Sequence, residues 1–320
     1  MKNIVCLGFA KCGTTLLDEA FRLSDRVCTP AYEKELKYFL PRNFPAAAQY
    51  DAYMSRFGSS ESALYSFEAS PPYIHQALPV LAQVLENIKS TLRERQVVVC
   101  IRHPVARAYS HYIHDLHTFG LFGNGVFNRR KDLLRRGAPG SFFDALKGAR
   151  LSLRYAAALR LVKEVFDKDE ISLFFLEHDA ARLHAWIGQV TDADVAAEIG
   201  GRMPTARTVF GRRPVPNYEV RGDSLIAFGS GPGEVVCYPD ADPAQVADVL
   251  AAQERWTLEL SADRIQELMG ECFEEDMKQC ADITGDTRFI NYISWPVKAQ
   301  SAEMQRAIPN SQLMAGDQEQ

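Results

Sequence analysis

The sequence predicts an α/β protein in three layers, with a mainly parallel central sheet covered by helices on both faces. Short apolar runs of strand composition alternate along the chain with segments whose apolar residues recur at helical spacing. Two of these runs, 3–8 and 96–101, are almost wholly apolar, as strands buried on both faces are. The chain has 320 residues, of which 47% are hydrophobic, and this is enough for one large domain of that class.

The expected elements follow from these patterns in chain order. The strands are expected at residues 3–8, 26–29, 63–68, 96–101 and 170–175. The helices are expected at residues 14–23, 74–88, 104–118, 141–147, 150–166 and 179–188. The third of these helices opens with Pro104, a residue favoured in the first helical turn.

The remaining segments have the composition of loops, late helices and a tail. Residues 119–140 hold glycines and the aromatic residues Phe119, Phe122 and Phe127, and so long a loop predicts a role in acceptor binding. The segment 203–243, rich in Arg, Pro and Gly, is expected to be mostly irregular, and helix character returns over 243–283. We expect a single domain over residues 1–298 and a disordered tail over 299–320.

Charge and cysteine usage exclude several classes of protein. The net charge of -5 argues against wholesale binding of nucleic acid or of anionic membranes. Seven cysteines stand without CxxC spacing, which favours a reduced cytoplasmic protein over a disulfide framework or a metal site. Strand-like sequence begins at Ile4, so no secretory signal is expected, and no apolar run approaches the ~18 residues of a membrane span.

Local basic clusters exist despite the acidic balance. The first is expected to be solvated surface and the second to lie nearer a site. The first comprises Arg129, Arg130, Lys131, Arg135 and Arg136, and the second Arg202, Arg207, Arg212, Arg213 and Arg221.

Two strand–turn–helix junctions have the composition of anion cradles. The strand at 3–8 runs into a loop with Lys11, Gly13 and two threonines, and the strand at 96–101 runs into Arg102 with Ser110 eight residues later. Backbone N–H groups at a helix N-terminus, with cationic and hydroxyl side chains beside them, bind anions. Two such cradles on one sheet predict a ligand with two separate anionic groups.

A metal-dependent nucleotide site fits the first junction less well. Gly8 and Gly13 match the first half of a Walker loop, but Thr14 stands where its Lys belongs and Lys11 lies mid-loop. A kinase also needs an acidic Mg²⁺ ligand after a neighbouring strand, whereas that strand is followed by Arg102. Arginine repels a metal ion and attracts phosphate, so the pattern favours an anionic donor that needs no metal.

The two junctions together resemble the sulfotransferases that use 3′-phosphoadenosine-5′-phosphosulfate (PAPS). The run Lys11-Cys12-Gly13-Thr14-Thr15 is similar to their 5′-phosphosulfate loop, and Arg102 with Ser110 is similar to their 3′-phosphate segment. Two further stretches, 34–39 and 67–73, resemble the branch that contains the heparan sulfate sulfotransferases. Residues 283–286 with Trp295 resemble the closing segment of the family. The resemblance covers most of residues 1–180 and implies a P-loop-like fold.

The resemblance also implies roles for individual residues at the donor. Lys11 is implied to neutralise the oxygen between phosphate and sulfate, and Cys12 is the small residue of the loop. The 5′-phosphate is implied to bind to the backbone N–H groups of Gly13, Thr14 and Thr15, and the 3′-phosphate to Arg102 and Ser110. A later stretch, 209–213, loosely resembles a further 3′-phosphate element, which adds Gly211, Arg212 and Arg213.

Sulfuryl transfer to a hydroxyl also needs a general base. Glu35 aligns with the family's catalytic Glu and is the first candidate, while Glu68 is either an alternative base or an ion-pair partner of Lys11 or Lys37. A histidine is a third possibility. Ala69 stands where the family often has Lys, which weakens the case for a glycosaminoglycan-like acceptor.

The sequence favours two other chemistries, metal binding and a cysteine nucleophile, less strongly. His111, His114 and His117 spread over ~120° of a helix, so the three imidazoles cannot share one ion, and no metal site is expected. Cys12 lies in positive potential that lowers a thiol pKa, but a nucleophilic role would need a paired base.

The sequence therefore predicts a sulfotransferase with PAPS as its co-substrate. Its acceptor is expected to be a hydroxyl, or an amine, of a small molecule, a glycolipid or a carbohydrate. The alternatives are a divergent P-loop small-molecule kinase, which would require Mg²⁺ and ATP, and a non-catalytic nucleotide-binding protein, which would bind the nucleotide without transferring sulfate.

Overall fold

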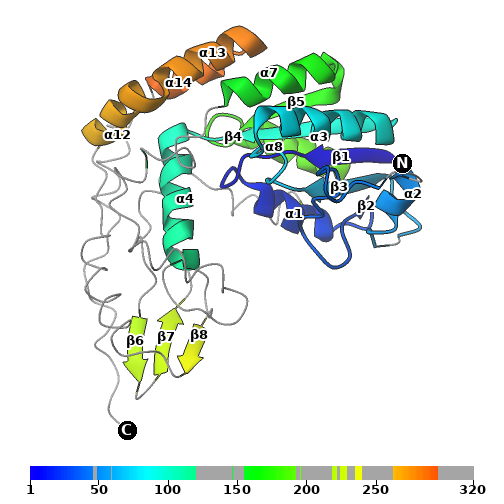
Figure 1. Cartoon of the computed structure of the whole chain (residues 1–320), viewed down its shortest axis with the longest axis horizontal. Helices are drawn as coiled ribbons and strands as arrows, with labels where there is room; N and C mark the ends of the chain where they lie inside the picture. The colour runs from blue at the N-terminus through cyan, green and yellow to red at the C-terminus, as the bar shows by residue number, and fades with distance from the viewer. Residues whose placement is uncertain are drawn as a thin grey trace.

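The computed structural model of the chain is organised around a five-stranded parallel sheet (Figure 1). The structure describes residues 1–45, 49–58, 60–119, 146, 155–191, 195, 218–221, 224–228, 235–239 and 262–294. The strands are β1 (Lys2–Cys6), β2 (Val27–Cys28), β3 (Tyr65–Ala69), β4 (Arg95–Ile101) and β5 (Ile171–Phe175), in the spatial order β2-β3-β1-β4-β5. The five strands predicted from the apolar runs are thus confirmed.

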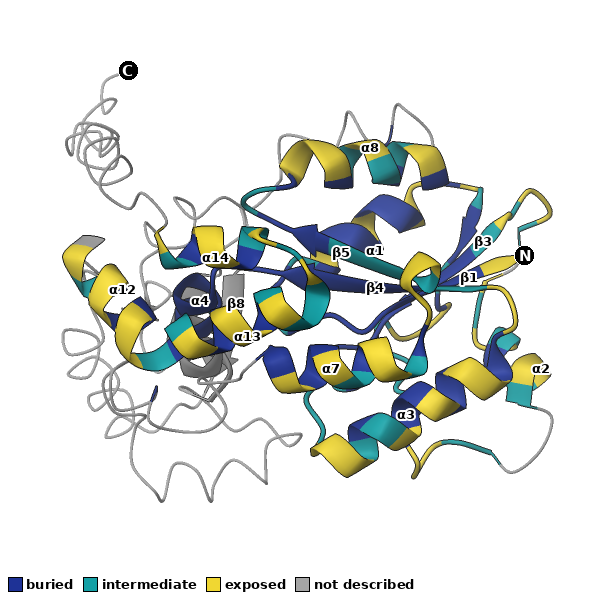
Figure 2. Ribbon diagram, turned by 90° about the horizontal axis from the view of Figure 1, so that it is seen from above, coloured by how far each residue is buried: buried dark blue, intermediate teal, exposed yellow. Residues whose placement is uncertain are grey.

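Helices cover both faces of this sheet, which confirms the predicted three-layer α/β class (Figure 2). One face carries α1 (Thr14–Arg22) and α8 (Ala180–Val190), and the other carries α3 (Leu78–Thr91) and α7 (Ala156–Val165). The remaining described helices are α2 (Gln49–Met54), α4 (Pro104–Phe119), a 3₁₀ turn (Lys168–Glu170), α12 (Ala262–Leu268), a π-helical turn (Met269–Phe273), α13 (Glu274–Thr284) and α14 (Arg288–Ile293).

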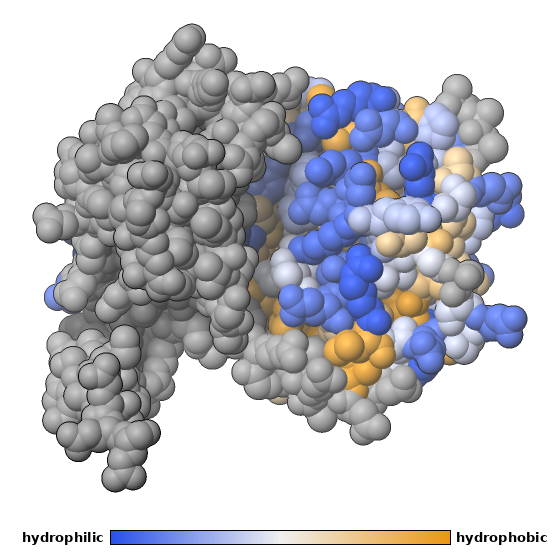
Figure 3. Space-filling view, turned by 90° about the horizontal axis from the view of Figure 1, so that it is seen from below, coloured by the Kyte–Doolittle hydropathy of each residue, from blue (hydrophilic) through white to orange (hydrophobic). Residues whose placement is uncertain are grey.

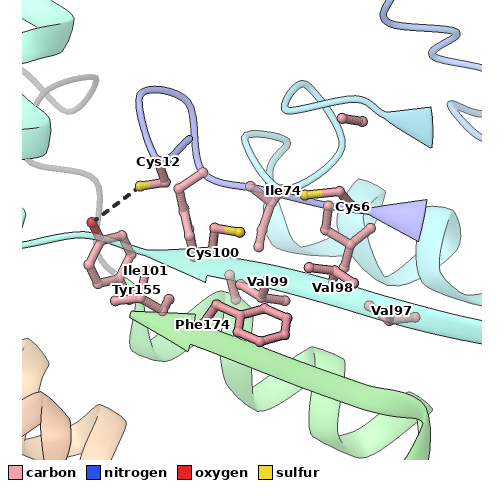
Figure 4. Close-up of a cluster of buried hydrophobic side chains, with 14 of the residues drawn as sticks. Cys6, Cys12, Ile74, Val97, Val98, Val99, Cys100, Ile101, Tyr155 and Phe174 are labelled. Carbon is pink, nitrogen blue, oxygen red and sulfur yellow. Dashed lines mark hydrogen bonds between the residues drawn. The ribbon is translucent and has the colours of Figure 1, made fainter. Parts of the chain in front are cut away.

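The centre of the sheet is fully apolar because β1 and β4 are buried on both faces. Residues 4–7 and 97–101 have no exposed surface, and side chains such as Ile74 and Phe174 pack against them (Figure 4). Burying each aliphatic side chain of this size contributes about 1.5–3 kcal/mol. The alternation of apolar strand and amphipathic helix therefore dictates this core.

Within the segment 203–243, which the sequence predicts to be mostly irregular, the described residues form three short strands. β6 (Tyr218–Arg221), β7 (Ser224–Phe228) and β8 (Val235–Pro239) form an antiparallel sheet in the order β6-β7-β8. Val, Ile, Phe and Tyr in these short runs have strand propensity. The many Pro and Gly residues around these runs are typical of loops, so the strands were not predicted.

The late helices close over one end of the parallel sheet. The carboxylate of Asp276 in α13 accepts hydrogen bonds from the backbone N–H groups of Tyr155 (2.7 Å) and Ala156 (3.1 Å). These are donors at the start of α7 that have no partner within the helix. A side chain 120 residues away in the sequence thus caps α7 and fixes the position of Tyr155.

The surface shown in Figure 3 is mostly hydrophilic where described residues form it, with hydrophobic residues in smaller groups. Exposed large apolar side chains include Tyr32, Leu23 and Leu64. No described helix combines the length and the apolarity that crossing a bilayer requires. The expected helix at 141–147 (except Leu146), the loop at 120–140 and the tail at 299–320 lie outside the described residues.

Candidate functional site

The carboxyl ends of β1, β3, β4 and β5 meet at one edge of the sheet, and the loops that follow them form the candidate site. β1 is followed by α1 on one face of the sheet, whereas its neighbour β3 is followed by α3 on the other (Figure 2). Ligands of open parallel sheets bind at such a reversal, because the loops diverge there. Both sequence-predicted cradles lie at this edge.

The loop between β1 and α1 is wound tightly by three residues with positive φ: Gly8 (36°), Lys11 (69°) and Gly13 (85°). A Cβ on Gly8 would lie 2.3 Å from Cγ2 of Thr14, and one on Gly13 would lie 3.0 Å from Cδ2 of Leu176. Both glycines are therefore required by close approach as well as by φ. Lys11 adopts a conformation that side-chain-bearing residues rarely take.

This loop delivers the N-terminus of α1 to the sheet edge with its backbone donors uncapped. Gly13 is the N-cap residue, and no side chain of the described residues caps the helix. The first backbone N–H groups of a helix have no partner within it and carry a partial positive charge. Thr14 and Thr15 add hydroxyls at this point, so the geometry suits a phosphate or sulfate group.

Arg102, which follows β4, contacts this loop. Its Nη1 donates to the carbonyl oxygen of Lys11 (3.0 Å), and its Nε lies 3.4 Å from Oε1 of Glu177. The arginine side chain is only 5% exposed. Its Nη2 makes no hydrogen bond to any described residue. The structure thus joins the two predicted cradles through the guanidinium of Arg102.

Glu177 also lies at the sheet edge that forms the candidate site, and the sequence did not predict a role for it. Its Oε2 accepts hydrogen bonds from the Tyr292 hydroxyl (2.8 Å) and from the His103 backbone N–H (3.2 Å). Burial raises the pKa of Glu177 above its ordinary value, and the neighbouring Arg102 opposes that shift. The signal available in the sequence was an acidic residue two positions after the apolar run that forms β5.

Tyr155 packs against the loop from the side of α7. Its ring lies 4.4 Å from that of Phe9, and its hydroxyl donates to the backbone oxygen of Arg102 (2.9 Å). The guanidinium carbon of Arg107 lies 5.8 Å from the ring centre. Because the ring is fully buried, Tyr155 is a packing residue and offers no stacking surface to adenine.

Cys12 faces Tyr155 rather than solvent. Its Sγ lies 3.9 Å from the tyrosine hydroxyl (Figure 4). Burial raises the pKa of the Cys12 thiol to about 12, and this outweighs the lowering by Arg107 and Arg102. The expectation that positive potential lowers this pKa is therefore wrong, because desolvation of a thiolate costs more than the two arginines return. Cys12 is the small residue of the loop.

A first prediction concerns this thiol. We expect Cys12→Ala to retain the activity of the wild-type protein within about threefold, since a protonated, buried thiol is no nucleophile. The native protein should also resist modification of Cys12 by iodoacetamide at pH 8, as peptide mass spectrometry would show. Labelling of Cys12 at the rate of a free thiol would contradict the burial described above.

The segment that follows β2 brings the candidate base to the same edge. Nζ of Lys34 donates to Oγ1 of Thr15 in the first turn of α1 (2.7 Å). The next residue, Glu35, has a side chain that is 33% exposed, and its Oε2 lies 3.7 Å from Nζ of Lys37. The structure thus brings the Glu35 segment into contact with the first turn of α1, and the Glu35 carboxylate is partly exposed.

Glu68, at the end of β3, is buried and accepts hydrogen bonds from two hydroxyls. Ser70 Oγ donates to Oε2 (2.8 Å) and the Tyr73 hydroxyl donates to Oε1 (3.1 Å). Burial raises the pKa of Glu68 from 4.5 to about 7, and the two hydroxyls oppose this shift. Lys37, offered by the sequence as an ion-pair partner, pairs with Glu35 instead.

The raised pKa of Glu68 predicts a specific dependence of stability on pH. Between pH 4.5 and about 7 the folded protein keeps the Glu68 proton that the unfolded chain has released, so the unfolding free energy falls as pH rises. The fall amounts to roughly 3 kcal/mol, since one pKa unit corresponds to ~1.4 kcal/mol. The difference in unfolding free energy between wild type and Glu68→Gln, from urea denaturation, should shrink by that amount across this window. A constant difference would contradict the raised pKa.

Ser110 and a pair of histidines lie on or near α4. Ser110 is half-buried on α4, and its neighbour His111 is buried with its ring centre 6.3 Å from that of His75. Nε2 of His75 accepts a hydrogen bond from the backbone N–H of Ala10 in the loop between β1 and α1 (3.0 Å). The side chains of His114 and His117 and all of Gly211, Arg212, Arg213 and Trp295 lie outside the described residues. Within the described part of the chain, no three metal-ligating side chains cluster.

Comparison with known proteins gives one kind of match. No protein-family model matches the chain, and neither does any curated protein. Among solved structures, the chain is similar to the crystal structure of a sulfotransferase from Alicyclobacillus acidocaldarius. The match covers 91% of this chain and 99% of that one, with a TM-score of 0.50 and 15% sequence identity. The α/β architecture described above is therefore the fold of a known bacterial sulfotransferase.

Proposed function

We propose that this protein is a sulfotransferase that uses PAPS to sulfate a hydroxyl, or an amine, of a small-molecule, glycolipid or carbohydrate acceptor. The observation that carries the proposal is the contact between Lys34 and Thr15, because it brings the Glu35 segment to an uncapped helix N-terminus. A sulfuryl donor site and a general base thereby share one sheet edge. The fold shared with a bacterial sulfotransferase supports the same reading.

In this proposal the loop between β1 and α1 binds the 5′-phosphosulfate. The backbone N–H groups of Gly13, Thr14 and Thr15 and the threonine hydroxyls hold its phosphate. Lys11, in the same loop, neutralises the charge that develops on the oxygen between phosphate and sulfate. Lys34 adds a second cation at the first turn of α1.

The 3′-phosphate is assigned to Arg102 and Ser110, with Gly211, Arg212 and Arg213 as further contacts. Arg102 fits this role through Nη2, a buried donor without a hydrogen bond to the described residues. Its other nitrogens face Lys11 and Glu177, so the guanidinium is held in place before a ligand arrives. Such preorganisation lowers the cost of binding.

In the proposed transfer step, the Glu35 carboxylate takes the proton of the acceptor hydroxyl. The acceptor oxygen then forms a bond to sulfur as the bond from sulfur to the 5′-phosphate oxygen breaks. The electron pair of that bond stays on the leaving phosphate, beside Lys11. Adenosine 3′,5′-bisphosphate and the sulfated acceptor are the products, and no metal ion is needed in the step.

We place the protein in the cytoplasm and its motifs closest to the heparan sulfate branch. The absence of disulfides among the described cysteines supports a reducing compartment. Ala69, at the end of β3, stands where that branch often has Lys, so we assign a less anionic acceptor than a glycosaminoglycan. The exposed ring of Tyr32, beside the Glu35 segment, suits the apolar or sugar face of such an acceptor.

Ligand-induced stabilisation tests the donor assignment directly. Adenosine 3′,5′-bisphosphate in EDTA should raise the melting temperature, because a ligand at 100 times its Kd adds about 2.7 kcal/mol of stability. ATP with Mg²⁺ should not match it. Radiolabelled PAPS supplied with pooled hydroxylated metabolites, sugars and lipids should then yield a labelled product. Stabilisation by Mg-ATP alone would indicate a kinase, and bisphosphate binding without transfer to any pool would indicate a non-catalytic protein.

A further inference from the structure

The backbone of residues 37–39, next to Glu35, is held at four points. The N–H of Lys37 donates to Ser70 Oγ (3.1 Å), and the carbonyl of Lys37 accepts from Asn43 Nδ2 (2.8 Å). The N–H of Phe39 donates to the Tyr73 hydroxyl (3.2 Å), and its carbonyl accepts from Asn87 Nδ2 (3.0 Å). Every backbone polar group of these two residues is thus bonded to a side chain.

Two of the four side chains that hold this backbone are hydrogen-bonded to the same carboxylate. Ser70 and Tyr73 each accept a backbone N–H from the segment, and each donates its own proton to Glu68. The donors and acceptors match in both hydrogen-bond chains, because a hydroxyl that accepts a hydrogen bond from a backbone N–H can still donate its own proton to the carboxylate. A chain of this kind strengthens each of its members.

The segment needs such support because its backbone is strained. Lys37 has φ of 52°, a conformation that costs a residue with a side chain about 1 kcal/mol or more. Strained residues persist where surrounding structure holds them. The left-handed turn at Lys37 places its Nζ 3.7 Å from the Glu35 carboxylate.

We propose that Glu68 is a positioning residue: through the Ser70 and Tyr73 hydroxyls, its carboxylate fixes the 37–39 backbone and thereby orients Glu35 toward the acceptor. This role rests on the proposed function and differs from that of a base, since Glu68 has no exposed surface. It acts on the transfer step rather than on the nucleotide, because none of its hydrogen-bonding partners belongs to the phosphate loop.

The variants Glu68→Gln, Ser70→Ala and Tyr73→Phe test the proposal, with Ser66→Ala as the matched control. Ser66 is also buried on β3, and its hydroxyl donates to Asn3 Oδ1 (2.8 Å) without touching the 37–39 segment. Trypsin cleavage after Lys34 and Lys37 of the native protein, followed by mass spectrometry, reports local opening of the segment. We expect cleavage at least fivefold faster in the three test variants and unchanged in the control.

Kinetics separate positioning from general damage. In the three test variants, kcat for transfer from PAPS to the acceptor found by the pooled screen should fall about tenfold or more, while the Kd for adenosine 3′,5′-bisphosphate stays within twofold. In the double variant that combines Glu68→Gln with Ser70→Ala, kcat should fall by less than the product of the two single decreases. Both changes break the same chain of hydrogen bonds, so their effects are not independent. If Glu68→Gln does not fold, the other two variants carry the test.

Two results would overturn the proposal. One is unchanged cleavage after Lys37 in the test variants, which refutes the anchor whether or not the protein transfers sulfate. The other is faster cleavage with an unchanged kcat, which refutes the link to Glu35. A wild-type protein that binds no bisphosphate and transfers no sulfate would refute the proposed function instead, and the cleavage measurement would still decide the anchor.

Discussion

Lys11→Ala is expected to lower kcat for sulfuryl transfer by about 10²–10³, the usual loss when one group that stabilises developing charge is removed. Lys11 belongs to the loop between β1 and α1, where the bond to the leaving phosphate is proposed to break. Alanine is a clean replacement because it carries a Cβ as lysine does, so the φ of 69° at this position is equally unfavourable for both, and because the backbone carbonyl that Arg102 binds is retained. The measurement is the initial rate of bisphosphate release from PAPS at a saturating acceptor concentration.

The matched control for this variant is Lys278→Ala. Lys278 is an exposed lysine on α13 that pairs with Glu274, away from the loop, and its loss should leave kcat unchanged. Lys11→Arg should recover part of the rate, since the charge is kept while its geometry changes. Equal rates for wild type and Lys11→Ala would remove Lys11 from the mechanism and with it the analogy to a phosphosulfate loop.

Glu35→Gln is expected to lower kcat by about 10²–10⁴, the range for loss of a general base. The amide has the size of the carboxylate but cannot take a proton from the acceptor. Glu35 is one residue from Lys34, which contacts Thr15, but the Glu35 carboxylate itself pairs with Lys37 at 3.7 Å. The Kd for adenosine 3′,5′-bisphosphate, measured by calorimetry, should therefore stay within twofold.

Glu33→Gln is the control for the base, because Glu33 is exposed in the same segment and is assigned no contact with acceptor or donor. Its kcat should match that of the wild type. Near-normal turnover by Glu35→Gln would show that another group takes the proton. In that event His75, bonded to the phosphate loop through Ala10, is the next residue to replace.

Composition and periodicity sufficed for the framework of this protein. The strand at 170–175, at the edge of the sheet, was predicted from Ile, Leu and Phe, which have strand propensity. The strand at 96–101 was predicted to within a residue because a parallel strand buried on both faces needs an almost unbroken apolar run, and chance rarely supplies one. The loop from Gly8 to Thr15 was recognisable for a similar reason. Its glycines are imposed by local backbone geometry, which is legible without knowledge of distant residues.

The small sheet β6–β8 was not recognised because its strands are short and lie among prolines and glycines. Local propensity is weak evidence at such lengths, and pairing between strands decides the outcome. The pKa of a side chain likewise depends on residues that are distant in the sequence. Nearby arginines were expected to lower the pKa of the Cys12 thiol, but burial, to which Tyr155 just before α7 contributes, raises that pKa to about 12.

The α/β class, the order of strands along the chain and the two loops suited to anions can be predicted from residue patterns. The folded chain was needed to show that Arg102 pairs with Glu177, that Lys34 reaches Thr15 and that Glu68 supports the Glu35 segment through two hydroxyls. Strands and tight turns are set by interactions among neighbours in sequence. The partner of a buried charge is set by which chain segments burial brings together, because a charge removed from water takes whatever donors the fold places beside it.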